Sequence, residues 1–454
     1  MGKNAHDTII HNALIVNEGR TFRGYVCIKG EFISEVNGGD MPDGYTASAA
    51  RVIDAGGKML LPGAIDDHVH FRDPGLTEKG DMATESRAAV AGGVTSFMDM
   101  PNTKPQTVTN KDWKAKMDRA AQASVANYAF WIGATDSNFG CLESIDYTQV
   151  PGIKIFVGSS TGNMTMHDQS ALKRIFSGIP DIIKAVHAED DSIIRENARK
   201  ERESNPGDIP IGRHPHIRSR EACVKATEAC IALAGEATSR LQVMHVSTED
   251  ELKLLTPGDK KAVTAETCVQ YLWWDSDDYA RLGSKIKCNP AIKDSNDREA
   301  LREAVRKGLI DIIATDHAPH LPADKQGDAL TAASGIPLIQ FSLPMMLQLA
   351  ENGIFDVPLV VEKMCHAPAR IFGIDRRGFL RPGYYADLVI AGRCNDDHAT
   401  VIKEEILSKC GWSPLEGEKL NWRVSSTWVN GKEVWDGCRI TATCPGRPLA
   451  FRKG

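Results

Sequence analysis

Residues 63–75 read GAIDDHVHFRDPG, and the interpretation of the whole chain begins with this stretch. A short apolar run ends in two histidines that are one residue apart, His68 and His70, and Arg72 follows them. In a β-strand, residues i and i+2 point to the same face. Both imidazoles can therefore be aimed at one metal ion. An arginine repels a cation, so Arg72 must serve another purpose.

The middle of the chain alternates β-rich apolar runs with longer segments of helical character. The runs are GAIDDHVH (63–70), VTSFMDMP (94–101), NYAFWIGAT (127–135), GIKIFVGS (152–159), IIKAVHAED (182–190), LQVMHVST (241–248), KAVTAETC (261–268) and IDIIATDH (310–317). The helical segments include residues 78–93, 219–237 and 296–308. This alternation is typical of a parallel sheet in an α/β protein. Eight strand–helix units predict a (β/α)8 TIM barrel over residues 62–378.

The two ends of the chain have a different sequence pattern from the middle. Residues 7–61 and the tail from 379 consist of short alternating strands with Gly and Pro turns between them. Asn430-Gly431 suits the tight turn of a β-hairpin. We expect the two ends to meet, so that residues 1–61 and 379–454 form one small composite β-sandwich domain beside the barrel.

The composition indicates a soluble enzyme of the cytoplasm. Apolar residues make up 42% of the 454 residues and charged residues 25%, with a formal net charge of -6. This balance argues against nucleic acid or an anionic membrane as a partner. The sequence contains neither a long apolar span nor a secretory signal at its start. Eleven cysteines without C-x-x-C pairs suit reduced thiols.

Six polar residues stand at or near the carboxyl ends of the predicted barrel strands, where barrel enzymes place their chemistry. They are His68, His70, Lys154, His187, His245 and Asp316. Imidazoles and a carboxylate suit Zn²⁺. Four histidines and an aspartate are too many for one catalytic zinc, so two ions joined by an anionic bridge are expected. Lys154 either pairs with a carboxylate or snorkels to the rim, or its amine takes up CO₂ and supplies the bridge as a carbamate.

At this point the sequence resembles the amidohydrolase superfamily and, within it, the dihydroorotases. The segments that carry the resemblance run in the family's order from end to end. They are DDHVHFRDPG, MDMPNT, KIFVGSS, AVHAED, VMHVST, KCNPAIK and ATDHAPH. H-x-H alone marks only the superfamily, whereas HVHFRDPG together with TDHAPH is far more specific.

The resemblance implies a role for each residue of the site. His68, His70 and Asp316 would hold the first zinc ion, His187 and His245 the second, and carboxylated Lys154 would bridge them. Asp316 would also act as the general acid and base. Arg72, Asn102 and His320 would bind the substrate carboxylate, and Asn289 the ring amides. Many relatives use an aspartate near the position of Lys154, and Asp146 lies upstream of it, so a centre with one metal stays open.

The implied activity is the reversible cyclisation of N-carbamoyl-L-aspartate to L-dihydroorotate in pyrimidine biosynthesis. Two alternatives stay open. The chain could be another cyclic amidohydrolase, such as a hydantoinase, dihydropyrimidinase or allantoinase, which shares the metal residues. It could also be a non-catalytic assembly subunit, although such subunits typically lack ligands that are present here. The expected partner is a small-molecule substrate, and a homodimer is left open.

Overall fold

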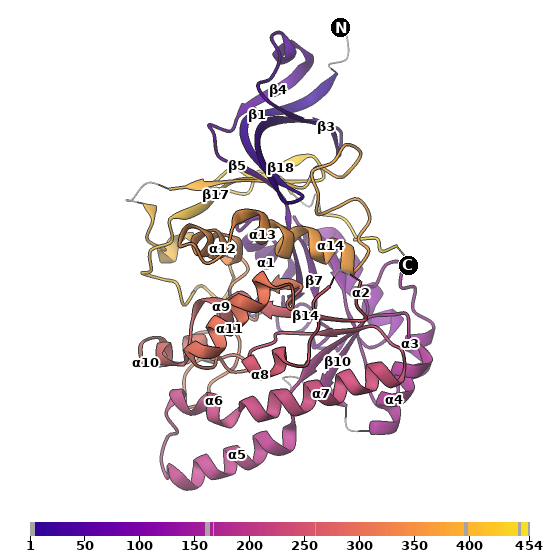
Figure 1. Cartoon of the computed structure of the whole chain (residues 1–454), viewed down its shortest axis with the longest axis vertical. Helices are drawn as coiled ribbons and strands as arrows, with labels where there is room; N and C mark the ends of the chain where they lie inside the picture. Colours follow the sequence, from indigo (N-terminus) through magenta and orange to yellow (C-terminus); the bar gives the residue numbers. More distant parts are fainter. Residues whose placement is uncertain are drawn as a thin grey trace.

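The computed structural model describes residues 5–158, 164–166, 168–258, 260–394, 398–443 and 446–452. Its centre is a ring of parallel β-strands (Figure 1). The strands of the ring are β6 (Ala64–Val69), β7 (Val94–Asp99), β8 (Asn127–Phe130), β10 (Ile153–Val157), β12 (Lys184–Ala188), β13 (Leu241–Val243), β14 (Val263–Cys268) and β15 (Ile312–Ala314). Each predicted run contains one of these strands, which confirms the barrel. Ser159, the last residue of the fourth run, lies outside the described residues.

Two features complete the ring. After Trp131, β8 continues into β9 (Ile132–Gly133), so that β8 pairs with β7 on one side and β9 pairs with β10 on the other. The first and last strands meet through a parallel bridge between Val69 and His317. The backbone N–H of His70 also donates to the carbonyl of His317 at 2.7 Å. The barrel is therefore closed beside the histidine pair that ends the first run.

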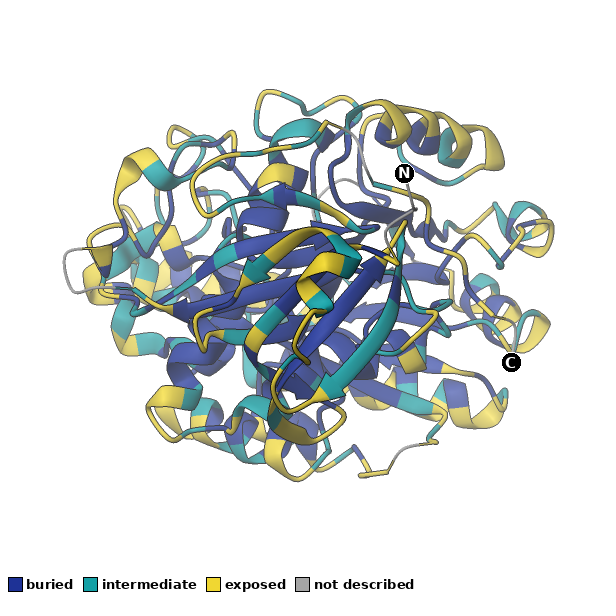
Figure 2. Cartoon of the chain, turned by 90° about the horizontal axis from the view of Figure 1, so that it is seen from above, coloured by how far each residue is buried: buried dark blue, intermediate teal, exposed yellow. Residues whose placement is uncertain are grey.

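Helices surround the ring, and exposed residues lie on their outer faces and on the loops (Figure 2). The three predicted helical segments form α1 (Met82–Ala91), α7 (Arg220–Glu236) and α11 (Ser295–Arg306). Each begins after a side chain that caps the first turn, because an oxygen of Asp81, Ser219 or Asp294 accepts a backbone N–H bond. Within the described residues no helix is long and apolar enough to span a bilayer.

The other α-helices of the described residues are between 4 and 14 residues long. They are α2 (Asn110–Ala123), α3 (Phe139–Glu143), α4 (Gln169–Gly178), α5 (Asp191–Ser204), α6 (His214–Ile217), α8 (Glu249–Leu252), α9 (Val269–Trp273), α10 (Tyr279–Leu282), α12 (Ser342–Glu351), α13 (Val357–Val361) and α14 (Ala367–Ile371). A short strand, β11 (Thr165–Met166), pairs with β10 at its carboxyl end.

A second sheet joins strands from both ends of the chain. Its order is β18-β17-β16-β5-β1-β2-β3, and β4 also pairs with β1. The bounds are β1 (His6–Asn17), β2 (Arg20–Lys29), β3 (Phe32–Gly38), β4 (Ala49–Asp54), β5 (Met59–Pro62), β16 (Leu388–Arg393), β17 (Trp422–Val429) and β18 (Lys432–Trp435). Asn430 and Gly431 have positive φ angles of 51° and 75° and turn the predicted hairpin between β17 and β18.

This sheet is one continuous hydrogen-bonded surface that bends around its own core. The first half of β1 pairs with β4 and the second half with β5. Buried Ile15 and Val26 from one half share a cluster with Leu60 and Ile390 from the other half. Strands from the two ends therefore meet, as expected. The division into a barrel at 62–378 and a composite domain at 1–61 and 379–454 stays a prediction.

A buried polar junction joins the terminal sheet to the barrel. The carboxylate of Asp387 forms an ion pair with Arg377, and both side chains are 3% exposed. The same carboxylate accepts the side-chain amide of Asn127 at 3.1 Å and the backbone N–H of Asn430 at 2.8 Å. Asn127 begins β8 of the barrel, whereas Asn430 lies in the terminal hairpin. One carboxylate therefore holds three segments that are far apart in sequence.

We expect Asp387→Asn to lower the free energy of unfolding by about 3–5 kcal/mol, because it leaves the buried Arg377 charge without its partner. Denaturant unfolding followed by circular dichroism would measure the change. The control is Glu203→Gln, which removes an exposed partner of Arg199 on α5 and should cost less than about 1 kcal/mol. Equal losses in both variants would contradict the role of Asp387.

Candidate metal centre

A small cavity opens at the carboxyl ends of the barrel strands, and nine of the ten predicted site residues line it. The residues of the lining that the sequence predicted are His68, His70, Arg72, Asn102, Lys154, His187, His245, Asn289 and Asp316. The tenth, His320, lies directly beside it and contacts Arg72. The structure therefore brings together side chains that are spread over more than half of the sequence.

The first group of candidate ligands comes from the two strands that close the barrel. An oxygen of Asp316 lies 3.0 Å from Nε2 of His70 and 3.3 Å from Nε2 of His68. The ligand atoms of the three residues all lie within 4.8 Å of one another. Two ligands on one tetrahedral zinc ion are about 3.4 Å apart, given metal–nitrogen distances near 2.05 Å. The three residues thus fit a divalent cation in donor chemistry and in spacing.

The second group is the pair His187 and His245. Nδ1 of His187 lies 2.9 Å from Nε2 of His245. The rings of His245 and His68 have centroids 5.3 Å apart, so the pair lies next to the first group. Burial lowers the pKa of His187, of His245 and of His68. It thereby favours neutral imidazole, the form that binds a metal.

Lys154 is fully buried on β10 and faces the same cavity. Its Nζ lies 2.8 Å from the sulfur of Met244 and 5.0 Å from the centre of the Phe156 ring. No carboxylate of the described part of the chain lies within ion-pair distance of Nζ. Burial lowers the pKa of Lys154 to about 8. The expected alternative, Asp146, is instead an exposed turn residue that accepts the N–H of Thr148 at 3.0 Å.

Backbone strain is concentrated at this cavity. Arg72, His245 and Asp316 have φ angles of 66°, 42° and 48°, in the left-handed region that non-glycine residues rarely adopt. All three residues lie two or three positions beyond the end of a barrel strand. Such strain costs about 1–3 kcal/mol per residue and typically persists where it positions functional side chains. The strained backbone re-aims these side chains into the mouth of the barrel.

Two buried glutamates support the histidines, and the sequence interpretation missed both. Glu266 on β14 accepts a hydrogen bond from Nδ1 of His68 at 2.8 Å and from the backbone N–H of His245 at 3.3 Å. Glu189 lies 3.1 Å from Nε2 of His187 and forms an ion pair with Arg218. Carboxylates that orient metal-binding histidines in this way are common around metal centres. For Glu266 the available signal was a glutamate inside a predicted strand, whereas Glu189 directly follows a strand.

Arg72 lines the cavity and contacts Pro319 and His320. It is 4% exposed, its Nε donates to the carbonyl of Pro319 at 3.1 Å, and its Nη2 lies 3.1 Å from Nε2 of His320. Within the described residues no carboxylate pairs with it. Asp66 is engaged by Thr315 and Asp73 by Arg119. Burial lowers the pKa of His320, so this neighbour is neutral. A buried guanidinium that no carboxylate contacts has the chemistry to bind an anion.

The two predicted asparagines, Asn102 and Asn289, also line the cavity. Oδ1 of Asn102 accepts a hydrogen bond from Nδ1 of His70 at 2.8 Å, so Asn102 orients a candidate ligand as well as lining the cavity. Oδ1 of Asn289 is buried and makes no hydrogen bond to any described residue. An orphaned buried oxygen in a cavity wall is suited to accept an N–H of a ligand.

The loop over residues 321–337 forms one wall of the cavity. Nζ of Lys325 donates to the carbonyls of Lys287, Ala333 and Gly335 at 3.1, 2.7 and 2.9 Å. Gly335 has a φ of 149°, and a Cβ there would lie 2.5 Å from the carbonyl oxygen of Ala318. The returning end of the loop is thus packed tightly against the end of the last strand. This anchoring favours a fixed wall over a lid.

Comparison with known proteins agrees with this fold and site. The profile of the amidohydrolase family matches residues 59–202 and 217–434. A dihydroorotase of Halobacterium salinarum is 33% identical over 386 residues, covering 84% of this chain and 88% of the relative. An allantoinase of Bacillus velezensis is 31% identical over 446 residues, covering 96% and 95%. The solved structure of an L-hydantoinase from Arthrobacter aurescens superimposes with a TM-score of 0.90 at 27% identity, covering 98% of this chain and 100% of that one.

The barrel, its histidine-lined mouth and these relatives define a hydrolase of cyclic amides. The chain belongs to the amidohydrolase family, as the sequence resemblance implied. The metal-ligand chemistry of the first group fits the metal dependence that is general in this family.

We expect Glu266→Gln to weaken metal binding by about 10–100-fold, because the neutral amide orients His68 less well than a carboxylate does. The metal content per chain after dialysis against graded chelator would measure this. Glu251→Gln is the matched control. Glu251 is also buried, but its carboxylate is bound by Thr227 and Thr248, away from the candidate ligands. The same metal affinity in both variants would contradict the role of Glu266.

Proposed function

We propose that this chain is a dihydroorotase, which interconverts N-carbamoyl-L-aspartate and L-dihydroorotate in pyrimidine biosynthesis. The observation that carries the proposal is the buried, unpaired guanidinium of Arg72. Among the activities named for the relatives, dihydroorotase acts on a ring that bears a carboxylate. Hydantoin and allantoin bear none, and would leave the charge of Arg72 without compensation.

The geometry of Arg72 supports this choice of substrate. Its Nε and one Nη already bond to Pro319 and His320, which hold the guanidinium plane in place. A guanidinium forms paired charge-assisted hydrogen bonds with a carboxylate, and no other side chain matches that shape as well. In the proposal His320 and Asn102 complete the carboxylate pocket. The orphaned Oδ1 of Asn289 accepts a ring N–H.

The proposed cofactor is a pair of zinc ions. His68, His70 and Asp316 would hold the first ion and His187 and His245 the second, with a carbamate on Lys154 as the bridge. Support comes from the spacing of the first group and from the absence of a carboxylate partner for Lys154 in the described residues. Divalent cations bound here supply hydroxide at neutral pH and Lewis-acid polarisation of a carbonyl.

In the proposed mechanism Asp316 carries the proton. During ring opening its carboxylate accepts a proton from the attacking water and delivers it to the departing ring nitrogen. Burial alone would raise the pKa of Asp316, but the neighbouring His68 and His70 hold it below its usual range, so the base form is available at neutral pH. Arg72 and Asn289 fix the ring so that the reacting carbonyl faces Asp316. Cyclisation reverses these steps.

Two rival functions lead to different expectations. An allantoinase or hydantoinase would use the same ligands, and the relatives include both. An assembly subunit without catalysis would lack ligands, yet every candidate ligand lines the cavity here. The proposal also places the enzyme in the cytoplasm, which suits the free cysteines of the described residues, with a homodimer as its assembly.

We expect the metal-loaded protein to open dihydroorotate, and to act poorly on hydantoin and allantoin. Arg72→Met should lower kcat/KM for dihydroorotate by about 100-fold, the equivalent of about 2.7 kcal/mol. The variant should keep or raise Tm, because it removes an uncompensated buried charge. Arg199→Met, at an exposed arginine on α5, is the control that should leave the kinetics unchanged. Turnover of allantoin or hydantoin without turnover of dihydroorotate would refute the proposal.

We expect Lys154→Ala to lose metal and activity together, and to regain part of both when a short carboxylic acid such as propionate fills the space. The control is Lys184→Ala. Lys184 is equally buried on the adjacent β12, but its Nζ bonds to Ser239 Oγ at 2.8 Å, outside the cavity. The metal content per chain and the turnover rate of each variant would be measured with and without propionate. Full metal content in Lys154→Ala would contradict the bridge.

A further inference from the structure

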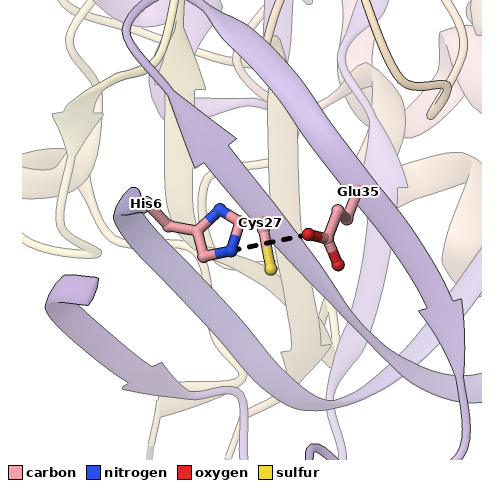
Figure 3. A group of neighbouring side chains, drawn as sticks. All are labelled: His6, Cys27 and Glu35. Carbon is pink, nitrogen blue, oxygen red and sulfur yellow. Dashed lines mark ion pairs between the residues drawn. The ribbon is translucent and has the colours of Figure 1, made fainter. Parts of the chain in front are cut away.

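A second group of metal-binding side chains lies in the terminal sheet, away from the barrel mouth. His6 at the start of β1, Cys27 on β2 and Glu35 on β3 come together on three adjacent strands (Figure 3). Cys27 pairs directly with Glu35 in the register of β2 and β3. The ligand atoms of the three side chains all lie within 4.8 Å of one another, and Nε2 of His6 is 3.5 Å from Oε1 of Glu35.

The outer atoms of two of these side chains are fixed by further hydrogen bonds. Nδ1 of His6 lies 3.2 Å from Oγ of Ser34. Oε2 of Glu35 accepts the Tyr45 hydroxyl at 2.8 Å and the Asn37 amide at 3.0 Å. Consequently Nε2 and Oε1 are the atoms that face each other and the thiol. Metal-ligating imidazoles and carboxylates are typically held from behind in this manner.

Cys27 adds an independent observation. It is 0% exposed, and its sulfur makes no hydrogen bond to any described residue. It packs with Ile9 and Tyr25 in a small buried cluster, and its sulfur also lies within 4.8 Å of the imidazole and the carboxylate. If the group served packing alone, a thiol beside an imidazole and a carboxylate would gain little there. A thiolate bound to a cation would satisfy all three side chains at once.

We propose that His6, Cys27 and Glu35 bind one divalent cation of borderline softness, such as Zn²⁺ or Co²⁺, with a water as the fourth ligand. Nitrogen, sulfur and carboxylate ligands in a tetrahedral set are typical of such ions. On binding, the metal–sulfur bond replaces the S–H bond, and the proton passes to solvent. The thiolate and the carboxylate then balance the two charges of the cation. The bound ion ties the first strand of the chain to the edge strand β3.

A cobalt titration of the full-length protein tests the site, because a thiolate bound to Co²⁺ gives a sulfur-to-metal charge-transfer band in the near ultraviolet. The barrel mouth is proposed to have no sulfur ligand, although Cys268 lies beside His68 and Glu266. Cys27→Ser should abolish the band, whereas Cys268→Ser should retain it. Turnover should be unchanged in Cys27→Ser, because Cys27 is remote from the cavity.

Two further pairs of variants sharpen the test. His6→Ala should raise the Co²⁺ concentration at which half of the band develops by at least 10-fold. His11→Ala, on the same strand, should leave that concentration unchanged. Tyr45→Phe should weaken binding by about 10-fold through loss of the bond that orients Glu35. Circular dichroism would verify that each variant is folded. A wild-type protein without the band, or a band that persists in folded Cys27→Ser, would overturn the proposal.

Discussion

Closure of the barrel between β6 and β15 is the constraint on which the candidate centre depends. The bridge from Val69 to His317 sets the histidine pair of the first strand beside Asp316 of the last. Asp66 reinforces the seam, because its carboxylate accepts the Thr315 hydroxyl at 2.6 Å. The same two strands continue into Arg72 and His320. Both the first group of candidate metal ligands and the buried arginine of the cavity are therefore assembled along one seam.

The cavity is polarised in a way that suits a substrate with an amide at one end and a negative charge at the other. On one side, the carboxylates of Asp316, Glu266 and Glu189 lie beside the imidazoles of His70, His68 and His187 and favour cations. On the other side stands a buried guanidinium whose contacts are a carbonyl and a neutral histidine. Folding removes these carboxylates and the guanidinium from water without pairing them with each other. Ligands bound to the two groups would offset the free-energy cost of this burial.

The sequence was sufficient for the barrel and for the gathering of the ten predicted residues, because parallel strands end at one edge and bring their terminal side chains together. It was insufficient for the supporting carboxylates. Glu266 lies within an apolar strand, and the pattern does not say whether such a residue faces inward to a histidine or outward. The isolation of Arg72 was equally hidden, since three aspartates lie within six residues of it. The engagement of Asp66 by Thr315 and of Asp73 by Arg119 is a tertiary effect, and Asp67 forms no ion pair within the described residues.

The arrangement of the terminal sheet affects how the chain folds during translation. β5 lies between β1 and β16, so one edge of β5 receives its partner only after residues 388–391 have left the ribosome. Until then the nascent amino-terminal hairpins present an open strand edge, which is prone to pairing with other chains. Synthesis of more than three hundred intervening residues separates the two events. During translation this edge needs shielding, either by a chaperone or by rapid docking onto the growing barrel.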